Sequence, residues 1–231
     1  MEVVLFFLRW IHFLAGITWI GILYYFNFVQ TPFFAETEAA VRTGAIQKLV
    51  PRALWWFRWG AMYTFLAGFL IYLIRLHEMG ASLFYSSSYG TTITIGGLMG
   101  TIMFLNVWLV IWPKQQIVIA SANQVAQGGQ ALPAAAGAGR RAALASRTNT
   151  VFSIPMLFFM GAASHYTSLM GPSGAKGIFW LLVLAVIVLV ELNALVGTQG
   201  GTKKPLDSVS GAIWFGFILT AIFYLLFLVL M

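Results

Sequence analysis

Three histidines are the strongest candidates for chemistry in this sequence. His12 lies within "LRWIHFLAGITWIGILYYFNFV", residues 8–29, a segment apolar enough to lie in a membrane, where an ionisable side chain is costly and usually functional. His165 ends the stretch "FFMGAASH", and His77 follows "LIYLIRL". The sequence contains no Cys, so thiolate metal sites and c-type haem attachment are excluded, and a metal would need His, Met or oxygen ligands.

Small residues accompany two of these histidines. On helices, Gly16 would lie one turn deeper in the membrane than His12, and Gly161 one turn deeper than His165. This arrangement predicts space for a flat group, and we expect His12 and His165 to ligate a haem b near the outer face of the membrane. The alternative is that the small residues serve ordinary helix packing and that each histidine bonds to a neighbouring helix.

Other polar residues have predicted roles around these histidines and deeper in the chain. His77 has bulky residues one turn deeper, so it is a weaker candidate metal ligand and is typical of a wetted boundary residue. Arg9 and Arg75 are candidate partners of haem propionates, because a guanidinium suits a carboxylate. Arg58 and Glu191 are expected at similar depth and are predicted to form an ion pair; the alternative for Glu191 is a proton or substrate relay.

Composition defines the setting of these residues. Of the 231 residues, 60% are hydrophobic and 8% are charged, which indicates an integral membrane protein in contact with membrane lipid. Since an open sheet cannot cross lipid, we expect a single all-α domain, residues 1–231, that is a bundle of six transmembrane helices. The predicted spans are residues 3–29, 53–76, 91–112, 149–170, 177–197 and 210–230.

Basic residues predict the orientation of this bundle. Nine Lys and Arg residues fall in the connections after the first, third and fifth predicted spans, against three on the opposite side. Both termini are therefore expected outside the cytoplasm. The segment 114–148 is expected to be a long cytoplasmic loop, its low-complexity part being a surface helix or a mobile stretch. This topology accounts for the net charge of +7, and nucleic acid is excluded as a partner.

Three stretches resemble a known family: "RWIHFLAGITWIGILYYFNFVQ", "WPKQQ" and "RTNTVFSIPMLFFMGAASHY". They are similar to the membrane-embedded N-terminal domain of the bacterial membrane-bound urate oxidases. The resemblance implies a multi-pass protein of the bacterial inner membrane and carries over His12 and His165 as family positions. In that family a c-type cytochrome commonly follows the domain; this sequence lacks one, which implies that cytochrome c or another redox subunit is a separate chain.

Three functions remain open from the sequence. The leading expectation is an electron-transfer protein that binds haem b and passes electrons to or from a periplasmic or membrane partner, with urate oxidation (urate hydroxylase activity) implied by the resemblance alone. A second is a cofactor-free accessory subunit of a larger respiratory or oxidase complex. A third is a transporter or copper-handling protein, although the sequence has no external loop rich in His or Met.

Overall fold

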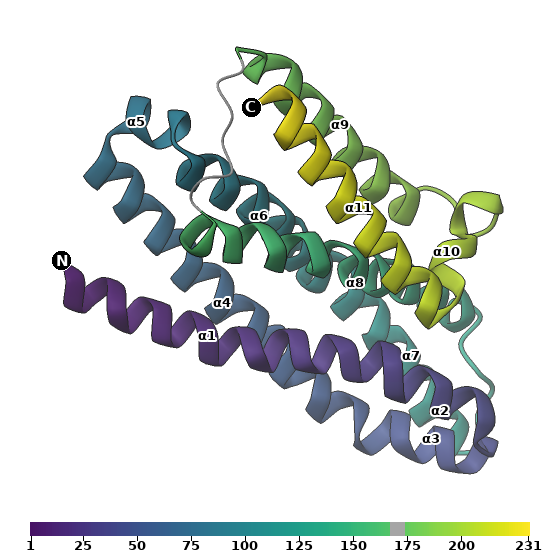
Figure 1. The fold of residues 1–231 in the computed structure, drawn as a ribbon. Helices are drawn as coiled ribbons and strands as arrows, with labels where there is room; N and C mark the ends of the chain where they lie inside the picture. Colours follow the sequence, from purple (N-terminus) through teal and green to yellow (C-terminus); the bar gives the residue numbers. More distant parts are fainter. Residues whose placement is uncertain (167–173) are drawn as a thin grey trace.

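The computed structural model describes residues 1–166 and 174–231, and every regular element in these ranges is helical. Figure 1 shows the long helices packed into one elongated bundle. The α-helices are α1 (Glu2–Tyr24), α2 (Thr31–Glu36), α3 (Ala39–Lys48), α4 (Val50–Met79), α5 (Ala81–Ser86), α6 (Ser88–Leu105), α7 (Trp112–Ala126), α8 (Ala135–His165), α9 (Lys176–Leu195), α10 (Lys204–Asp207) and α11 (Val209–Leu230). The other helical elements are η1 (Tyr25–Gln30), η2 (Asn106–Ile111) and η3 (Gly201–Lys203).

Among the described residues, five helical segments are long and apolar enough to cross a membrane. They are Glu2–Glu36, Val50–Met79, Ser88–Ala126, Lys176–Leu195 and Val209–Leu230. Four of the six predicted spans fall within these segments, and a fifth, 177–197, matches Lys176–Leu195 except for its last two residues. Residues 149–165 of the fourth predicted span lie in α8. Residues 167–170 of that fourth span lie outside the described residues.

Helix α8 lies in the middle of the bundle and is too polar to belong to the apolar set. It contacts α6, α7, η2, α9 and α11, and its buried residues include the polar run Arg147–Thr150 and Ser153. Neighbouring helices, rather than lipid, cover these side chains. Hydropathy reflects composition and not what surrounds a residue, so a central helix with polar contacts scores as less apolar than its neighbours.

Most of the segment 114–148, predicted as a long connection with a surface helix or a mobile stretch, is helical. Helix α7 extends to Ala126 and α8 begins at Ala135, so the connection without helix is only residues 127–134. The stretch is rich in Ala and Gln, which favour helix, and this local preference explains why both helices extend beyond the apolar segments.

Two long helices contain a π-helical segment directly before a proline. η1 ends two residues before Pro32, and η2 ends two residues before Pro113. Proline has no N–H and its ring crowds the carbonyl four residues earlier, so a locally wider helix relieves this conflict. Each π-helix also places a buried asparagine at or near its start, Asn27 and Asn106.

Small residues allow close approach of neighbouring helices. A Cβ added to Gly60 of α4 would lie 3.1 Å from the backbone nitrogen of Trp19 and 3.3 Å from the carbonyl oxygen of Ala15, both on α1. On α6, Gly96 packs in the same way against Met160 of α8. The fold therefore uses the close helix contacts that are typical of membrane bundles.

The chain ends and connections separate into two groups at opposite ends of the bundle. Figure 1 shows the N-terminus, the C-terminus and α5 towards one end. The short helices α2 and α3, the α7–α8 connection and α10 lie towards the other. Helix α3 and the α9–α11 segment, at this second end, contain four of the basic residues: Arg42, Lys48, Lys203 and Lys204.

Candidate functional site

His12 lies in the interface between α1 and α4. Its Nδ1 is 2.8 Å from the carbonyl oxygen of Thr64, a residue that is 7% exposed. One turn further along α4, Gly68 leaves room for the imidazole: a Cβ there would lie 2.8 Å from Cε1 and 3.0 Å from Nδ1 of His12. The hydrogen bond to the Thr64 carbonyl oxygen and the space left by Gly68 thus determine the position of the imidazole.

This contact determines which nitrogen of the His12 imidazole carries the proton. A carbonyl oxygen can only accept a hydrogen bond, so Nδ1 is the donor when the ring is neutral. The lone pair is then on Nε2, which makes no hydrogen bond to a described residue. Metal-ligating histidines commonly have this arrangement, with one N–H bonded to a backbone carbonyl and the other nitrogen free to bind.

The structure changes the interpretation of the small residues near His12. Gly16 faces α4, and a Cβ on it would lie 3.8 Å from the methyl group of Thr64. Helix α4 therefore occupies the side of α1 that the sequence indicated as open space, and Gly16 serves helix packing. At Gly161, by contrast, no heavy atom of another described element lies within 4 Å of an added Cβ.

His165 and His77 lie at helix ends and are exposed. His165 is the last residue of α8 and His77 is in the last turn of α4. Neither forms a hydrogen bond to another described residue, and no hydrogen bond or ring contact joins His12 to His165. Within residues 1–166 and 174–231, no group of three or more His, Asp or Glu side chains is arranged to hold a metal ion.

Arg9 and Arg75 gather near one hydroxyl group. The positive charges of Arg75 and Arg9 both act on the hydroxyl of Tyr89, near the start of α6. Arg75 also forms an ion pair with Glu78, with NH1 2.8 Å from Oε2. The two arginines predicted to act together are thus close to the same tyrosine, on three different helices of the bundle.

The predicted ion pair between Arg58 and Glu191 does not form. The guanidinium carbon of Arg58 lies 3.9 Å from the ring centroid of Trp112 and 4.9 Å from that of Trp108. Glu191 instead accepts a hydrogen bond from Asn106, with Nδ2 3.0 Å from Oε2. Stacking on indole rings stabilises a guanidinium without a carboxylate, and this is the contact that the sequence reasoning missed.

The two buried asparagines of the π-helices both bind α8. Asn27 donates to Ser146 Oγ at 2.8 Å, and Asn106 donates to Asn149 Oδ1 at 2.9 Å. Asn149 in turn donates to the carbonyl oxygen of Met103 at 2.9 Å. These bonds link η1, η2 and α6 to adjacent turns of α8, and together they form a polar belt inside the bundle.

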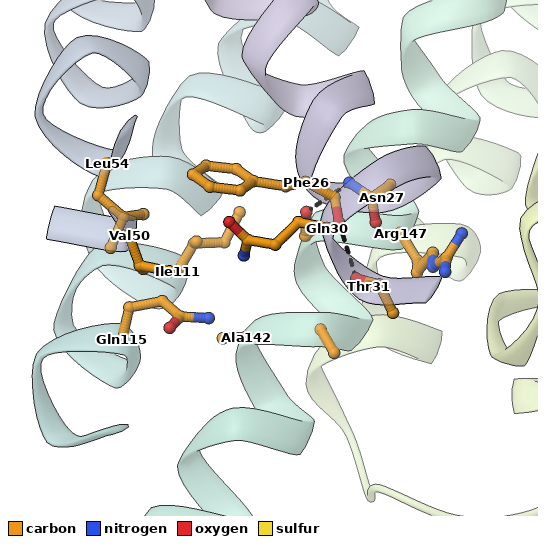
Figure 2. Close-up of a pocket in the computed structure, with 12 residues that line it drawn as sticks. Phe26, Asn27, Gln30, Thr31, Val50, Leu54, Ile111, Gln115, Ala142 and Arg147 are labelled. Carbon is orange, nitrogen blue, oxygen red and sulfur yellow. Dashed lines mark hydrogen bonds between the residues drawn. The ribbon is translucent and has the colours of Figure 1, made fainter. Parts of the chain in front are cut away.

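A cavity of about 100 Å³ lies beside this belt, between η1, α4, α7 and α8. Figure 2 shows the side-chain amides of Gln30 and Gln115 extending towards each other across it, while the guanidinium of Arg147 lies on the far side of Thr31. The Gln30 Oε1 atom is buried without a hydrogen-bond partner. The volume and polarity suit a few water-sized groups rather than a large cofactor.

At the end of the bundle that contains this cavity, basic side chains form hydrogen bonds and an ion pair between α8 and the α9–α11 connection. Arg140 donates to the carbonyl oxygen of Thr198 at 3.0 Å and pairs with Asp207 at 2.8 Å. Lys203 is 3% exposed and donates to the carbonyl oxygen of Val196 at 2.9 Å. Burial lowers the pKa of Lys203, and the positive charges of Arg141 and Arg140 lower it further.

Sequence reasoning missed several residues that build these sites. Thr64 and Gly68 are revealed only by the packing of α4 on α1, although both lie on one face of α4 with Gly60, at intervals of four residues. That spacing of small residues was the available signal. Asn149 had a signal too, because it lies in a polar run within an otherwise apolar segment.

These features define an all-helical chain with several helices that could cross a membrane, built around a central polar helix. The family model described as Urate oxidase N-terminal matches residues 73–222, which is well over half of the chain. The chain therefore belongs to this family, as the resemblance of its first, third and fourth helical stretches implied. Neither a curated protein nor a solved structure matches the chain.

Proposed function

We propose that this chain is a haem b-binding electron-transfer protein of the urate oxidase N-terminal type. The proposal places the chain in the bacterial inner membrane with six crossings, which are the five apolar segments and α8. Both termini lie outside the cytoplasm in this proposal. In this proposal His12 Nε2 and His165 would hold the haem iron, and Arg9 and Arg75 would contact the propionates.

The observation that carries the proposal is the contact between His12 Nδ1 and the Thr64 carbonyl oxygen, at 2.8 Å. It orients the imidazole and leaves the lone pair of Nε2 uncommitted, which is what iron ligation requires of a histidine. Bound haem would supply a one-electron redox change. The chain's own residues orient the imidazole and supply positive charge near Tyr89.

Two further observations support the crossing topology in this proposal. A polar central helix can cross a membrane where other helices cover it, and α8 is covered by α6, α9 and α11. Most of the basic residues lie in α3, the first turn of α4, α7, the first half of α8 and the α9–α11 connection. The α3 helix, the α7–α8 connection and α10 lie towards one end of the bundle. An excess of Lys and Arg in short connections is typical of the cytoplasmic side.

Family membership supports urate as the electron donor. Cytochrome c, or another subunit of a larger membrane complex, is the proposed partner. This part of the proposal rests on the family description rather than on a binding site in the bundle, because the cavity beside Gln30 is small and lies at the end opposite to the termini.

An oxidised-minus-reduced spectrum of the purified protein, with a pyridine haemochrome assay, tests the proposal. We expect a b-type signal of about one haem per chain. The His12→Ala and His165→Ala variants should lose it, whereas His77→Ala, which changes an exposed histidine at the end of α4, should retain it. Anaerobic addition of urate should then reduce the oxidised protein.

Two results would contradict the proposal. A colourless preparation of folded protein would favour the cofactor-free accessory subunit, and stoichiometric copper in a metal analysis would favour the copper-handling alternative. An unchanged spectrum in His12→Ala would remove the ligand assignment even if haem is bound.

A further inference from the structure

Glu191 is a carboxyl group on a membrane-type helix without a cationic partner. It lies in α9, one of the five apolar segments, about one turn before the helix ends at Leu195. Its only hydrogen bond within the described residues comes from Asn106, whose Nδ2 is 3.0 Å from Oε2. Among the described residues, ion pairs form only at Arg75–Glu78 and Arg140–Asp207.

The cations on neighbouring elements are committed elsewhere. Arg58 of α4 lies over the Trp112 ring, and Arg141 of α8 donates to the carbonyl oxygen of Ala194. Lys203 of η3 donates to Asn193 Oδ1 at 3.1 Å and to a backbone carbonyl. Arg147 of α8 is the exception: it forms no hydrogen bond or ion pair with a described residue, and it is not paired with Glu191.

The surroundings of Glu191 also disfavour a negative charge. The carbonyl groups at a helix C-terminus present partial negative charge, so a carboxylate near the end of α9 is repelled by its own helix. Its neighbours along the helix are apolar and partly exposed: Leu189 is 66% and Leu192 is 46% exposed. An unpaired carboxylate in such surroundings is costly, whereas the neutral acid is not.

The amide of Asn106 suits a carboxylic acid. Its nitrogen donates to Glu191 Oε2 and to Asn149 Oδ1, while its own oxygen accepts no hydrogen bond from a described residue. A carboxylic acid has one O–H to donate and a carbonyl oxygen that accepts, so the acid and the amide can satisfy each other.

We propose that Glu191 is a proton-binding site within the membrane part of the bundle, where it holds a neutral carboxyl group that exchanges its proton and is positioned by Asn106. The ligand is the proton alone. The site is separate from the His12 interface, so it does not depend on the proposed haem. The bonds from Asn106 to Asn149 and from Asn149 to Met103 connect any change in protonation to η2 and to α8.

Labelling by a hydrophobic carbodiimide, dicyclohexylcarbodiimide, tests this proposal on the full chain in detergent or in vesicles. The reagent requires the protonated acid: one nitrogen of the carbodiimide takes the acid proton, and the carboxyl oxygen adds to its central carbon. Rearrangement then leaves a stable N-acylurea that mass spectrometry locates. We expect Glu191 to be labelled at neutral pH and the label to decline as the pH rises.

Controls within the same chain make the test specific. Glu78 and Asp207 are ion-paired carboxylates and should stay unlabelled. Glu191→Gln keeps an oxygen that accepts from Asn106, so it should fold and lose the label. Asn106→Leu removes a bond that favours the carboxylate, so labelling should persist to higher pH, by about one unit. Leu189→Ala, which changes an exposed side chain on the same helix, should label as the unmodified chain does.

Either of two results would overturn the proposal. The first is a folded chain in which Glu191 stays unlabelled across the pH range while hydrophobic probes reach the neighbouring residues. The second is an extent of labelling at Glu191 that does not change between acidic and alkaline pH, because the reaction would then not depend on protonation of the carboxyl group.

Discussion

Replacing Gly68 with alanine tests whether α4 positions the His12 imidazole. The added methyl carbon would lie 2.8 Å from Cε1 and 3.0 Å from Nδ1 of His12, whereas ordinary van der Waals contact begins near 3.4 Å. The ring must therefore move by about half an ångström, or α1 and α4 must separate. Either movement lengthens the 2.8 Å hydrogen bond to the Thr64 carbonyl oxygen.

The expected magnitude follows from three opposing effects. Overpacking costs about 1–3 kcal/mol, and weakening an interhelical hydrogen bond in a membrane costs about 0.6–2 kcal/mol. Alanine recovers up to about 1 kcal/mol because it forms helix better than glycine. The net expectation for Gly68→Ala is a loss of about 1–3 kcal/mol in the free energy of unfolding, and of part of the haem if His12 is a ligand.

Thermal unfolding in detergent and haem content per chain are the two measurements. Gly21→Ala is the matched control, because Gly21 lies on α1, the helix of His12, and no heavy atom of another described element lies within 4 Å of a Cβ added there. The reasoning is refuted if Gly68→Ala unfolds at the same temperature as Gly21→Ala. Reduced stability with an unchanged haem spectrum would keep the packing argument and remove His12 as a ligand.

Four further predictions follow from the same structure. Gly60→Ala places a methyl group against the backbone of α1, which cannot yield, and should lower the free energy of unfolding by about 1–3 kcal/mol, measured by thermal denaturation. Asn149→Leu removes the central residue of the polar belt and should cost about 1–2 kcal/mol in the same assay; an unchanged transition would show that the belt adds no stability. Because the folded state lowers the pKa of Lys203, the folded chain should gain stability as the pH rises through that lowered pKa towards the unfolded value, and Lys203→Met should flatten this alkaline part of the profile. Since the chain has no Cys, single cysteines at Ser82 and Gln127 should react with impermeant thiol reagents from opposite sides of the membrane, Ser82 from the periplasm; labelling of both from one side would overturn the crossing topology.

Much of the fold follows from local properties of the chain. Runs of apolar residues make helices obligatory in lipid, since only internal hydrogen bonds satisfy the backbone there, and these runs give the positions of the long helices. The ends of the helices were less predictable. Ala-rich segments extend α7 and α8 beyond the apolar runs, and the two prolines widen η1 and η2 without ending the helices.

Contacts between helices were where sequence reasoning failed. The sequence predicts a pair between Arg58 and Glu191 because an unpaired charge in an apolar segment is costly and both residues lie at similar depth. In the bundle Arg58 stacks on the Trp112 ring and Glu191 accepts a hydrogen bond from Asn106. The rotation of each helix about its axis determines which side chains are in contact. Depth along a helix can be counted from the sequence, but rotation depends on packing against every neighbour.

The sequence by itself determined that this is an all-helical chain with several membrane-type segments and that it belongs to the urate oxidase N-terminal family. It also identified the few polar groups in apolar segments as the candidates for function or for contacts between helices. These properties depend on composition and on local preference. Only the tertiary structure decided that Gly16 faces Thr64 rather than open space, that His12 presents Nε2, and that Asn106 binds Glu191. Each of these depends on two helices that are distant in the sequence meeting at one depth and one rotation, and only the packed bundle specifies both.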